Sequence, residues 1–399
     1  MQRIIISFLL SNIIRFICCQ SFDDIKFLHK DLLLDYNKHI RPESNMENPT
    51  KVYVGINLVT LADLDEVKGQ LSIVGFLNIS WTDTNLIWKP WDYGDAYSTW
   101  LSSSTIWKPR LLSGNSVNVP TFIDVADLQT LVEYDGTCYW LPGVLWHLSC
   151  KINNVQFPFD IQECYVILLA WPYLHLMQDI QLVSMFPSAN REYYAEHVTW
   201  ELIETKTYVI SRYDIPAIQF DFKFKRRHKY FVITLICPLI FIGILNILVF
   251  KIPSQSGERI GYAITVLLSV AVYMTIASNL LPPSSLPDLS YISMLLLENL
   301  ILSCFIMISA IYGLHCYHYP DDKPIPWIYQ KLYACRQKVS RRKEKISDST
   351  LGLDSSKTQE YFWNKVTWKQ VSEHLDTFFF IFYFFCLVAI HANYIIKVI

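Results

Sequence analysis

One stretch of the chain carries polar side chains at helical spacing inside an otherwise apolar segment. It runs from Glu258 to Leu281 and exceeds the about 20 apolar residues that a helix needs to cross a bilayer. Steps of three or four residues place the following side chains on one helical face: Glu258, Gly261, Thr265, Leu268, Val272, Thr275 and Asn279. This face, called the stripe below, is polar at both ends and apolar in the middle. The pattern suits the wall of a water-filled pore with an apolar gate, and a membrane helix with scattered small polar residues is the alternative.

The other faces of this helix suit packing against further helices. They carry Ile260, Tyr262, Ile264, Val266, Leu267, Val270 and Ile276. A single helix cannot enclose a pore, so the pore interpretation requires several copies of the chain around one axis.

The composition of the whole chain is that of a membrane protein. Of its 399 residues, 52% are hydrophobic and 18% are charged, which is below the roughly 25% charged residues of soluble domains. The formal net charge of -2 implies no nucleic-acid partner. Four segments are candidates for spanning the bilayer: Tyr230–Phe250, Ile260–Leu281, Tyr291–Leu314 and Thr377–Ile399.

The first 20 residues are similar to a secretory signal peptide. Arg3 precedes the apolar run Ile4–Leu10, although Arg15 interrupts the apolar core. An uncleaved membrane anchor is the alternative. Export would place residues 21–229, which contain no comparable apolar run, outside the cell, where disulfides can form.

The C-terminal part of the chain alternates between membrane and soluble segments. We expect the first three spanning helices at 230–314, with the pore helix at about 259–281, a cytoplasmic loop at 315–376 and the fourth spanning helix at 377–399. The loop is assigned to the cytoplasm because Arg336–Lys345 is strongly basic, and such loops stay inside. Pro238 should kink the first spanning helix, because proline has no backbone N–H to donate.

The soluble domain is predicted to be a β-sandwich preceded by a helix. Apolar residues recur at near-helical spacing from Asp23 to Tyr36. From Val52 the period changes to two, and short alternating runs separated by Gly, Pro, Asn and Asp continue to Lys225. Alternation of this kind over many short strands is typical of a sandwich.

Three cysteines lie in the soluble domain beyond the presumed signal. Cys150 and Cys164 enclose 13 residues, and a bridge between them would contribute roughly 3 kcal/mol by loop closure. Metal ligation is a poor alternative, because no Cys-x-x-Cys or His-rich spacing accompanies them. Cys138 is then left over and is expected to be a buried small hydrophobe.

The segment around these cysteines resembles the signature of the pentameric Cys-loop ligand-gated ion channels. Between Cys150 and Cys164 stand Phe157, Pro158, Phe159 and Asp160, and Trp81-Thr82-Asp83, Ile106–Pro109, Trp200–Leu202 and Ile264–Ser269 also match. The pore helix is most similar to the nicotinic acetylcholine receptor branch, and the resemblance covers almost the whole chain. It implies a disulfide between Cys150 and Cys164. It further implies an extracellular β-sandwich with an N-terminal helix, a four-helix transmembrane bundle, and assembly as a homo- or heteropentamer.

The resemblance assigns roles to the stripe. Glu258 would form a ring of carboxylates at the cytoplasmic mouth and favour monovalent cations. Thr265 would offer hydroxyls to the ions, and Leu268 and Val272 would form the apolar gate. Asn279 departs from the family, where an acidic residue is common, so we expect a weakened attraction for cations at the outer mouth.

The family binds its agonist, a small-molecule neurotransmitter, between two subunits in an aromatic cage. Cation–π attraction there holds an ammonium group. The resemblance carries candidate residues over to this cage: Trp171, Tyr173 and either Tyr208 or Tyr213 on one face, and Phe76, Leu131 and Tyr139 on the neighbouring face.

Several cage positions of the nicotinic branch are missing. Gly114 stands where that branch has a tyrosine, Ile215 stands at its second loop tyrosine, and the paired cysteines of its principal subunits are absent. Three explanations stay open. The subunit supplies only the complementary face of a heteromer, it binds another amine in place of acetylcholine, or it binds no agonist.

The residues between the two cysteines are expected to couple the domains. In the family this tip, here Phe157, Pro158, Phe159 and Asp160, rests near the link between the second and third spanning helices, and Arg226 matches the basic residue at this junction. A stiff aromatic contact suits the transfer of a two-state motion, and simple adhesion of two domains is a compatible alternative.

Enzymatic functions find no support in the sequence. It contains no phosphate-binding glycine loop, no HExxH and no nucleophile elbow, so we expect neither catalysis nor a cofactor. A four-helix transporter would not explain the large disulfide-bearing domain. We therefore expect a multi-pass plasma-membrane receptor, surrounded by membrane lipid, with its N-terminal domain outside and a postsynaptic location compatible with the family. A non-conducting subunit remains the alternative.

Overall fold

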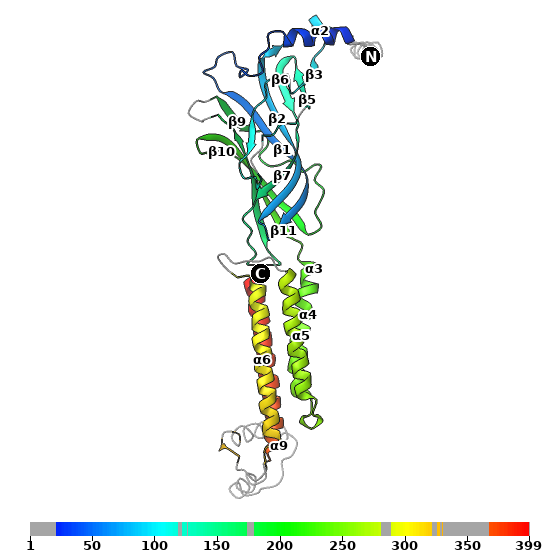
Figure 1. Ribbon diagram of the computed structural model, residues 1–399, viewed down its shortest axis with the longest axis vertical. Helices are drawn as coiled ribbons and strands as arrows, with labels where there is room; N and C mark the ends of the chain where they lie inside the picture. Colours follow the sequence, from blue (N-terminus) through cyan, green and yellow to red (C-terminus); the bar gives the residue numbers. More distant parts are fainter. Residues whose placement is uncertain are drawn as a thin grey trace, which may run out of the picture. The chain divides into compact units, whose positions relative to one another are not determined.

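The computed structural model describes residues 21–118, 122–125, 127–173, 179–280, 289–320, 325–327, 329 and 367–398 (Figure 1). The chain divides into two compact units, Met1–Asn153 with Ile161–Arg227, and Asn154–Asp160 with His228–Ile399. The expected signal peptide at 1–20, the link at 281–285 and most of the expected loop at 315–376 lie outside the described residues.

The first unit opens with helix α2 (Phe22–Leu33), close to the predicted range. A capping box begins it, because Ser21 Oγ accepts a hydrogen bond from the N–H of Asp23 and the Asp24 carboxylate accepts one from the N–H of Ser21. Leu28 and Leu32 form its buried face.

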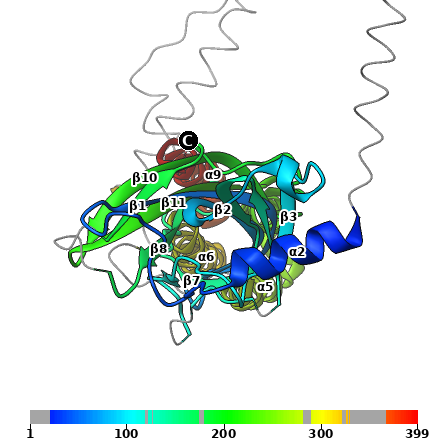
Figure 2. The same ribbon diagram turned by 90° about the horizontal axis from the view of Figure 1, so that it is seen from above.

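Two sheets follow and form the predicted sandwich (Figures 1 and 2). The larger has the order β3-β5-β6-β2-β1-β9, with β7 also paired to β2. Its strands are β1 (Thr50–Asp65), β2 (Gln70–Ile87), β3 (Ser98–Ser102), β5 (Gln129–Glu133), β6 (Asp135–Trp140), β7 (Gly143–Ser149) and β9 (Ile180–Ser184). The smaller has the order β10-β11-β8-β4 and consists of β4 (Leu111–Ser113), β8 (Ile161–Ala170), β10 (Trp200–Arg212) and β11 (Ile215–Arg226).

The core lies between the sheets and follows the period of two. Alternate residues of β1 and β11, such as Val54 and Phe222, are fully buried in one cluster. Cys138 is a free, fully buried thiol in this cluster, as predicted. Tyr36 donates a hydrogen bond of 2.5 Å to the carboxylate of Asp83, and burial raises the pKa of Asp83.

The first spanning segment of the second unit is irregular near Pro238. It consists of α3 (Lys229–Phe231), a π-helical turn η3 (Val232–Ile236), α4 (Cys237–Ile247) and a 3-10 turn η4 (Leu248–Lys251). Pro238 lies in the first turn of α4, where its missing N–H leaves the preceding turn without a regular α partner. The irregularity predicted at Pro238 therefore takes the form of a π turn.

The remaining spanning helices are α5 (Arg259–Leu280), α6 (Tyr291–Tyr317) and α9 (Trp368–Val398), with a 3-10 turn η5 (Ser254–Ser256) before α5. Together with Lys229–Lys251 they are long and apolar enough to cross a membrane. Helix α9 begins nine residues before the predicted 377. The difference arises because Trp368, Val371 and Leu375 are buried against Cys316 at the end of α6, so tertiary packing extends the helix.

Candidate functional site

The stripe lies on the free face of α5. All seven of its residues are exposed in the single subunit, Leu268 by 62% and Val272 by 50%. The opposite face is buried against α4 and α6 through Ala263, Val266, Val270 and Ala277. Ile264 and Ile276, which we expected to pack, are also exposed. The surface of α5 that is available for contacts with other subunits is therefore wider than the stripe.

Two threonine hydroxyl groups of α5 donate hydrogen bonds to backbone carbonyls of the same helix. Thr265 Oγ1 donates to the Gly261 carbonyl at 2.8 Å, and Thr275 Oγ1 donates to the Ala271 carbonyl at 3.1 Å. A hydroxyl whose proton is used in this way presents only acceptor lone pairs outward. Such oxygens suit a passing cation better than an anion.

A buried ion pair lies behind the start of the stripe. Arg259 Nη1 donates to Asp376 Oδ2 at 2.9 Å, and Nη2 donates to Oδ1 at 2.5 Å. Arg259 is 1% exposed, whereas its neighbour Glu258 is exposed. Sequence reasoning missed this pair because its members are 117 positions apart. The sequence offered one signal for this pair. Arg259 stands beside the stripe at the start of an apolar helix that packs against other helices, so a buried partner for its charge was to be expected.

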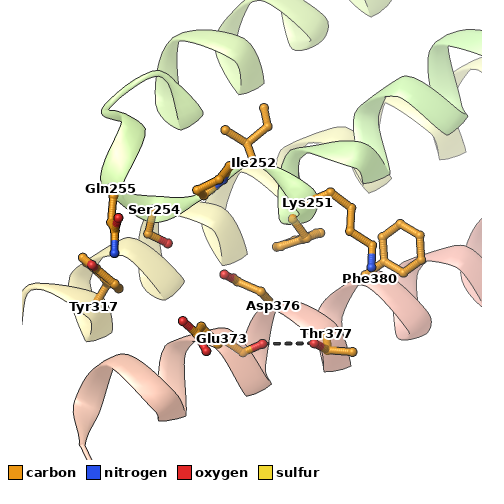
Figure 3. Close-up of a pocket in the computed structure, with 11 residues that line it drawn as sticks. Lys251, Ile252, Ser254, Gln255, Tyr317, Glu373, Asp376, Thr377 and Phe380 are labelled. Carbon is orange, nitrogen blue, oxygen red and sulfur yellow. Dashed lines mark hydrogen bonds between the residues drawn. The ribbon is translucent and has the colours of Figure 1, made fainter.

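A polar pocket of about 280 Å³ adjoins the ion pair (Figure 3). Figure 3 shows Glu373 and Asp376 projecting from α9 toward the turn that carries Ser254. On another side of the pocket the ammonium group of Lys251 lies 4.5 Å from the ring centroid of Phe380.

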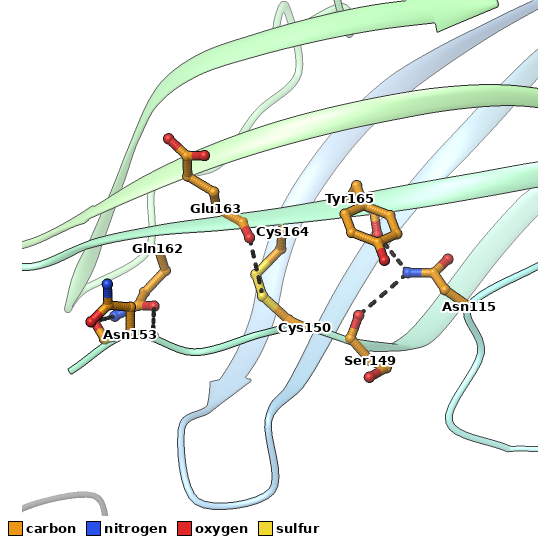
Figure 4. Close-up of a disulfide and its surroundings, with 8 residues drawn as sticks. All are labelled: Asn115, Ser149, Cys150, Asn153, Gln162, Glu163, Cys164 and Tyr165. Carbon is orange, nitrogen blue, oxygen red and sulfur yellow. Dashed lines mark hydrogen bonds between the residues drawn. A yellow bond between two sulfur atoms is a disulfide. The ribbon is translucent and has the colours of Figure 1, made fainter. Parts of the chain in front are cut away.

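The predicted disulfide between Cys150 and Cys164 is present (Figure 4). At the base of its loop, the Gln162 side chain accepts a hydrogen bond from the N–H of Asn153 and donates one to the Asn153 carbonyl, both at 2.9 Å. The Asn115 amide donates to the Tyr165 carbonyl at 2.8 Å and accepts from the N–H of Ile167 at 3.1 Å. The loop therefore leaves the sandwich from a fixed base.

The tip of the same loop belongs to the helical unit. Phe157, 1% exposed, packs against Phe231 of α3, and its carbonyl accepts a hydrogen bond of 3.4 Å from the Tyr394 hydroxyl of α9. The ring of Phe159 lies 4.7 Å from that of His228. Pro158 and Asp160 are buried. The tip residues proposed for coupling are thus packed among the helices.

Arg226 lies within the sandwich unit. Its guanidinium is 2.7 Å from the Glu66 carboxylate and 4.3 Å from the ring centroid of Trp200. Only 3% of the residue is exposed. Sequence reasoning did not foresee Glu66 as its partner.

The outer face of the four-stranded sheet carries Trp171 and Tyr208, which are 43% and 44% exposed. In the ladder, Tyr208 lies beside Gln219, and Gln219 lies beside Ile167. The β11–β8 ladder ends at Ala217 and Leu169, and Arg212 pairs with Ile215 at the end of the β10–β11 ladder. Trp171 directly follows β8, where its N–H donates to the Arg110 carbonyl at 3.1 Å, and it shares the parity of Ile167 and Leu169.

Aliphatic side chains cover the surface of the four-stranded sheet between Tyr208 and Trp171. We call this cluster the aliphatic pad: Leu112, Ile167, Leu169, Ile210, Ile215 and Ala217. A Cβ on Gly114 would lie 3.1 Å from Leu169 Cδ1 and 3.3 Å from Ile167 Cγ2, so a larger side chain there would displace the pad. The two departures at Gly114 and Ile215 thus belong to one packing arrangement.

The hairpin between β10 and β11 closes with a two-residue turn. Tyr213 and Asp214 have φ of 55° and 59°, which is the left-handed region that primed hairpin turns require. Tyr213 is 80% exposed, and the Arg212 guanidinium lies 5.7 Å from its ring centroid. The positively charged side chain of Arg212 therefore lies beside one of the tyrosines of the expected cage.

Tyr173 faces away from this surface. It is half-buried against the sandwich core, and burial raises the pKa of its hydroxyl. Its packing makes Tyr173 a weaker cage candidate than Trp171.

The complementary candidates lie on the outer face of the seven-stranded sheet. Leu131 pairs with Tyr139, and Phe76, 48% exposed, lies on β2 with the same outward parity. Trp100 pairs with Leu131 and is 54% exposed, a neighbour that sequence reasoning missed because the β3–β5 register was unknown. The two candidate faces lie on opposite sides of the sandwich, so one site needs two copies.

Comparisons with known proteins agree with this architecture. The model of the neurotransmitter-gated ion-channel ligand binding domain matches residues 26–228, and that of the neurotransmitter-gated ion-channel transmembrane region matches residues 235–312.

Curated relatives include acetylcholine receptor subunits from vertebrates and a nematode. Neuronal acetylcholine receptor subunit alpha-5 of Bos taurus is 28% identical over 79% of this chain and 68% of its own length. Neuronal acetylcholine receptor subunit alpha-3 of Homo sapiens is 31% identical over 65% of this chain and 52% of its own length. Acetylcholine receptor subunit alpha-type acr-16 of Caenorhabditis elegans is 32% identical over the same shares. The chain thus spans about half the length of the last two.

Proposed function

The chain belongs to the neurotransmitter-gated ion-channel family, and we propose that it is a subunit of a pentameric, cation-selective channel opened by an extracellular agonist. Membership makes it a multi-pass receptor of the plasma membrane, with the ligand-binding domain outside, and not an enzyme. The observation that carries the proposal is the stripe, which is exposed along the whole of α5 while the opposite face is buried.

Cation selectivity follows from the charges that face the proposed pore. Glu258 is exposed at one end of the stripe, whereas the positive charge of Arg259 is buried and paired with Asp376. Thr265 and Thr275 present acceptor oxygens, and Asn279 adds no charge at the other end. Monovalent cations therefore meet negative charge and oxygen ligands on this path.

Agonist binding is assigned to the interface between neighbouring subunits. Trp171, Tyr208 and Tyr213 would come from one subunit, and Phe76, Leu131 and Tyr139 from the next. This division is supported by their placement on opposite outer faces of the sandwich. The names of the relatives favour acetylcholine as the first agonist to test.

A second candidate is an accessory subunit of a heteromer, and the aliphatic pad favours it. Ile215 and Gly114 stand at two positions where the nicotinic branch has tyrosines, and Arg212 would repel an ammonium group. The outer face of the seven-stranded sheet keeps the aromatic side chains Phe76 and Tyr139. As an accessory subunit, the chain would supply this complementary face to a site whose other half comes from a companion subunit.

Whole-cell recording of the chain expressed alone separates these candidates. The screen includes acetylcholine, choline, serotonin, other biogenic amines and pH steps. An evoked current that follows the sodium gradient, and that Trp171→Ala abolishes without loss of surface protein, supports a self-sufficient channel. Trp91→Ala is the matched control, because Trp91 is 70% exposed in the 3-10 helix η1 (Pro90–Tyr93), which carries none of the candidate cage residues. Current only with a companion subunit supports the accessory role, and a current that follows chloride refutes cation selectivity.

A further inference from the structure

The ion pair between Arg259 and Asp376 fixes the first turn of α5. Besides its two bonds to the carboxylate, Arg259 Nη1 donates to Ser254 Oγ at 3.0 Å, and the guanidinium carbon lies 5.5 Å from the ring centroid of Phe250. Two parallel bonds to one carboxylate determine the orientation of a guanidinium as well as its charge balance. The side chain of Arg259 is therefore directed into the bundle.

The orientation of Arg259 determines that of Glu258. Glu258 directly precedes α5, and its carbonyl accepts a hydrogen bond of 2.9 Å from the N–H of Tyr262, so its backbone is held against the same first turn as Arg259. With Arg259 drawn inward, Glu258 lies outside, where it is exposed. Gly257, at φ 72°, reverses the chain just before this pair.

The surrounding helices are shaped to hold the pair. A Cβ on Gly313 of α6 would lie 3.0 Å from Asp376 Oδ1, so a larger residue there would press on the carboxylate. Ser372, one turn before Asp376, donates to the Gly313 carbonyl at 2.8 Å. Helices α5, α6 and α9 thus meet at this point.

We propose that Asp376 is a positioning residue for ion conduction, which keeps the Arg259 guanidinium away from Glu258. The inference rests on the proposed cation channel. An arginine does not lose its proton, and a buried unpaired guanidinium is costly. Without the carboxylate, the side chain of Arg259 turns to water beside Glu258 and cancels the charge that attracts cations. A residue of the fourth helix thereby sets a property of the pore.

Single-channel recording tests the consequence for conduction. The recordings use Leu268→Thr, which makes the apolar girdle polar, so that opening needs no agonist. Asp376→Asn should lower sodium conductance by about twofold or more, because each subunit adds an opposing charge. Combining Asp376→Asn with Arg259→Gln should restore conductance, since no guanidinium is left to turn outward. A purely structural role predicts that the double variant is no better than the single one.

Glu373→Gln is the matched control, because Glu373 is exposed and lies one turn away on the same helix. It should leave conductance unchanged. Unchanged conductance in Asp376→Asn, or an equal loss in Glu373→Gln, would overturn the inference while leaving a cation channel in place.

Chemical modification tests the position of the guanidinium without any current. The purified full chain is treated with phenylglyoxal, which reacts with accessible arginines, and modification of Arg259 is measured by peptide mass spectrometry. Arg259 should be protected in the wild type and in Glu373→Gln, and should react about tenfold faster in Asp376→Asn. Equal protection in Asp376→Asn would refute the inference. If the channel conducts chloride or nothing, the proposed function fails and this assay alone decides on Asp376.

Discussion

Phe157 and Phe231 pack edge to face, with ring centroids 5.1 Å apart. Phe157 comes from the tip of the disulfide loop, and Phe231 lies in the first turn of the first spanning segment. The disulfide at the base of the loop belongs to the sandwich, whereas its tip belongs to the helices. The disulfide loop therefore has its base in the sandwich unit and its tip in the helical unit, and the contact between Phe157 and Phe231 holds the tip against the first spanning segment.

A double-mutant cycle on this ring pair should report coupling in channel opening. Phe157→Leu and Phe231→Leu each remove a ring while keeping an apolar side chain. Because edge-to-face pairs contribute about 0.5–1.5 kcal/mol beyond area burial, each single change should shift the opening equilibrium by up to about tenfold. The double change should add little to either one. Additive effects in agonist concentration–response curves, at equal surface expression, would show that the contact plays no part in opening.

The patterns that repeat along the sequence predicted most of the fold. The period of two from Val52 predicted the sandwich, and the stripe from Glu258 to Asn279 is the free face of α5. Contacts between distant segments were not accessible in this way. The pair of Arg259 and Asp376, and the position of Trp100 beside Leu131, depend on helix packing and strand register. The half-buried position of Tyr173 against the sandwich core was likewise not accessible, because a motif spacing does not tell which face of a strand end is buried.

Cysteine accessibility should distinguish the two faces of α5. Thr265→Cys and Val272→Cys place thiols on the exposed stripe, whereas Val266→Cys and Val270→Cys place them on the buried face, at 8% and 3% exposure. A water-soluble thiol reagent should block current in the first two variants and leave the last two unaffected, because only the stripe meets water in a pore. The wild-type chain controls for its native cysteines. Equal block at Val266→Cys would contradict the assignment of the stripe to the pore.

Removing the charge at Arg212 should improve recognition of ammonium agonists. Arg212 pairs with Ile215 at the end of the β10–β11 ladder, and its guanidinium lies 5.7 Å from the ring centroid of Tyr213, where a like charge opposes cation–π binding. Arg212→Gln should therefore lower the concentration of acetylcholine needed for half-maximal current by about tenfold, which corresponds to about 1.4 kcal/mol. Arg191→Gln is a control, because Arg191 lies elsewhere in the sandwich, hydrogen-bonded to the Leu202 carbonyl. No gain with Arg212→Gln would mean that the aliphatic pad alone limits the site.

The attachment of α2 should weaken on mild acidification. His29 of α2 bonds to Thr99 Oγ1 of β3 at 2.7 Å, and burial lowers the pKa of His29 below its ordinary value of 6.5. The folded state therefore binds fewer protons at this site than the unfolded state, so stability is present above pH 6.5 and is lost as the pH falls toward the lowered pKa. Hydrogen exchange of the α2 amides, corrected for intrinsic rates, should accelerate at pH 5.5 relative to pH 7.5 in the full chain. His29→Gln should abolish this pH dependence because glutamine does not titrate, and an unchanged dependence in that variant would assign the effect to another group.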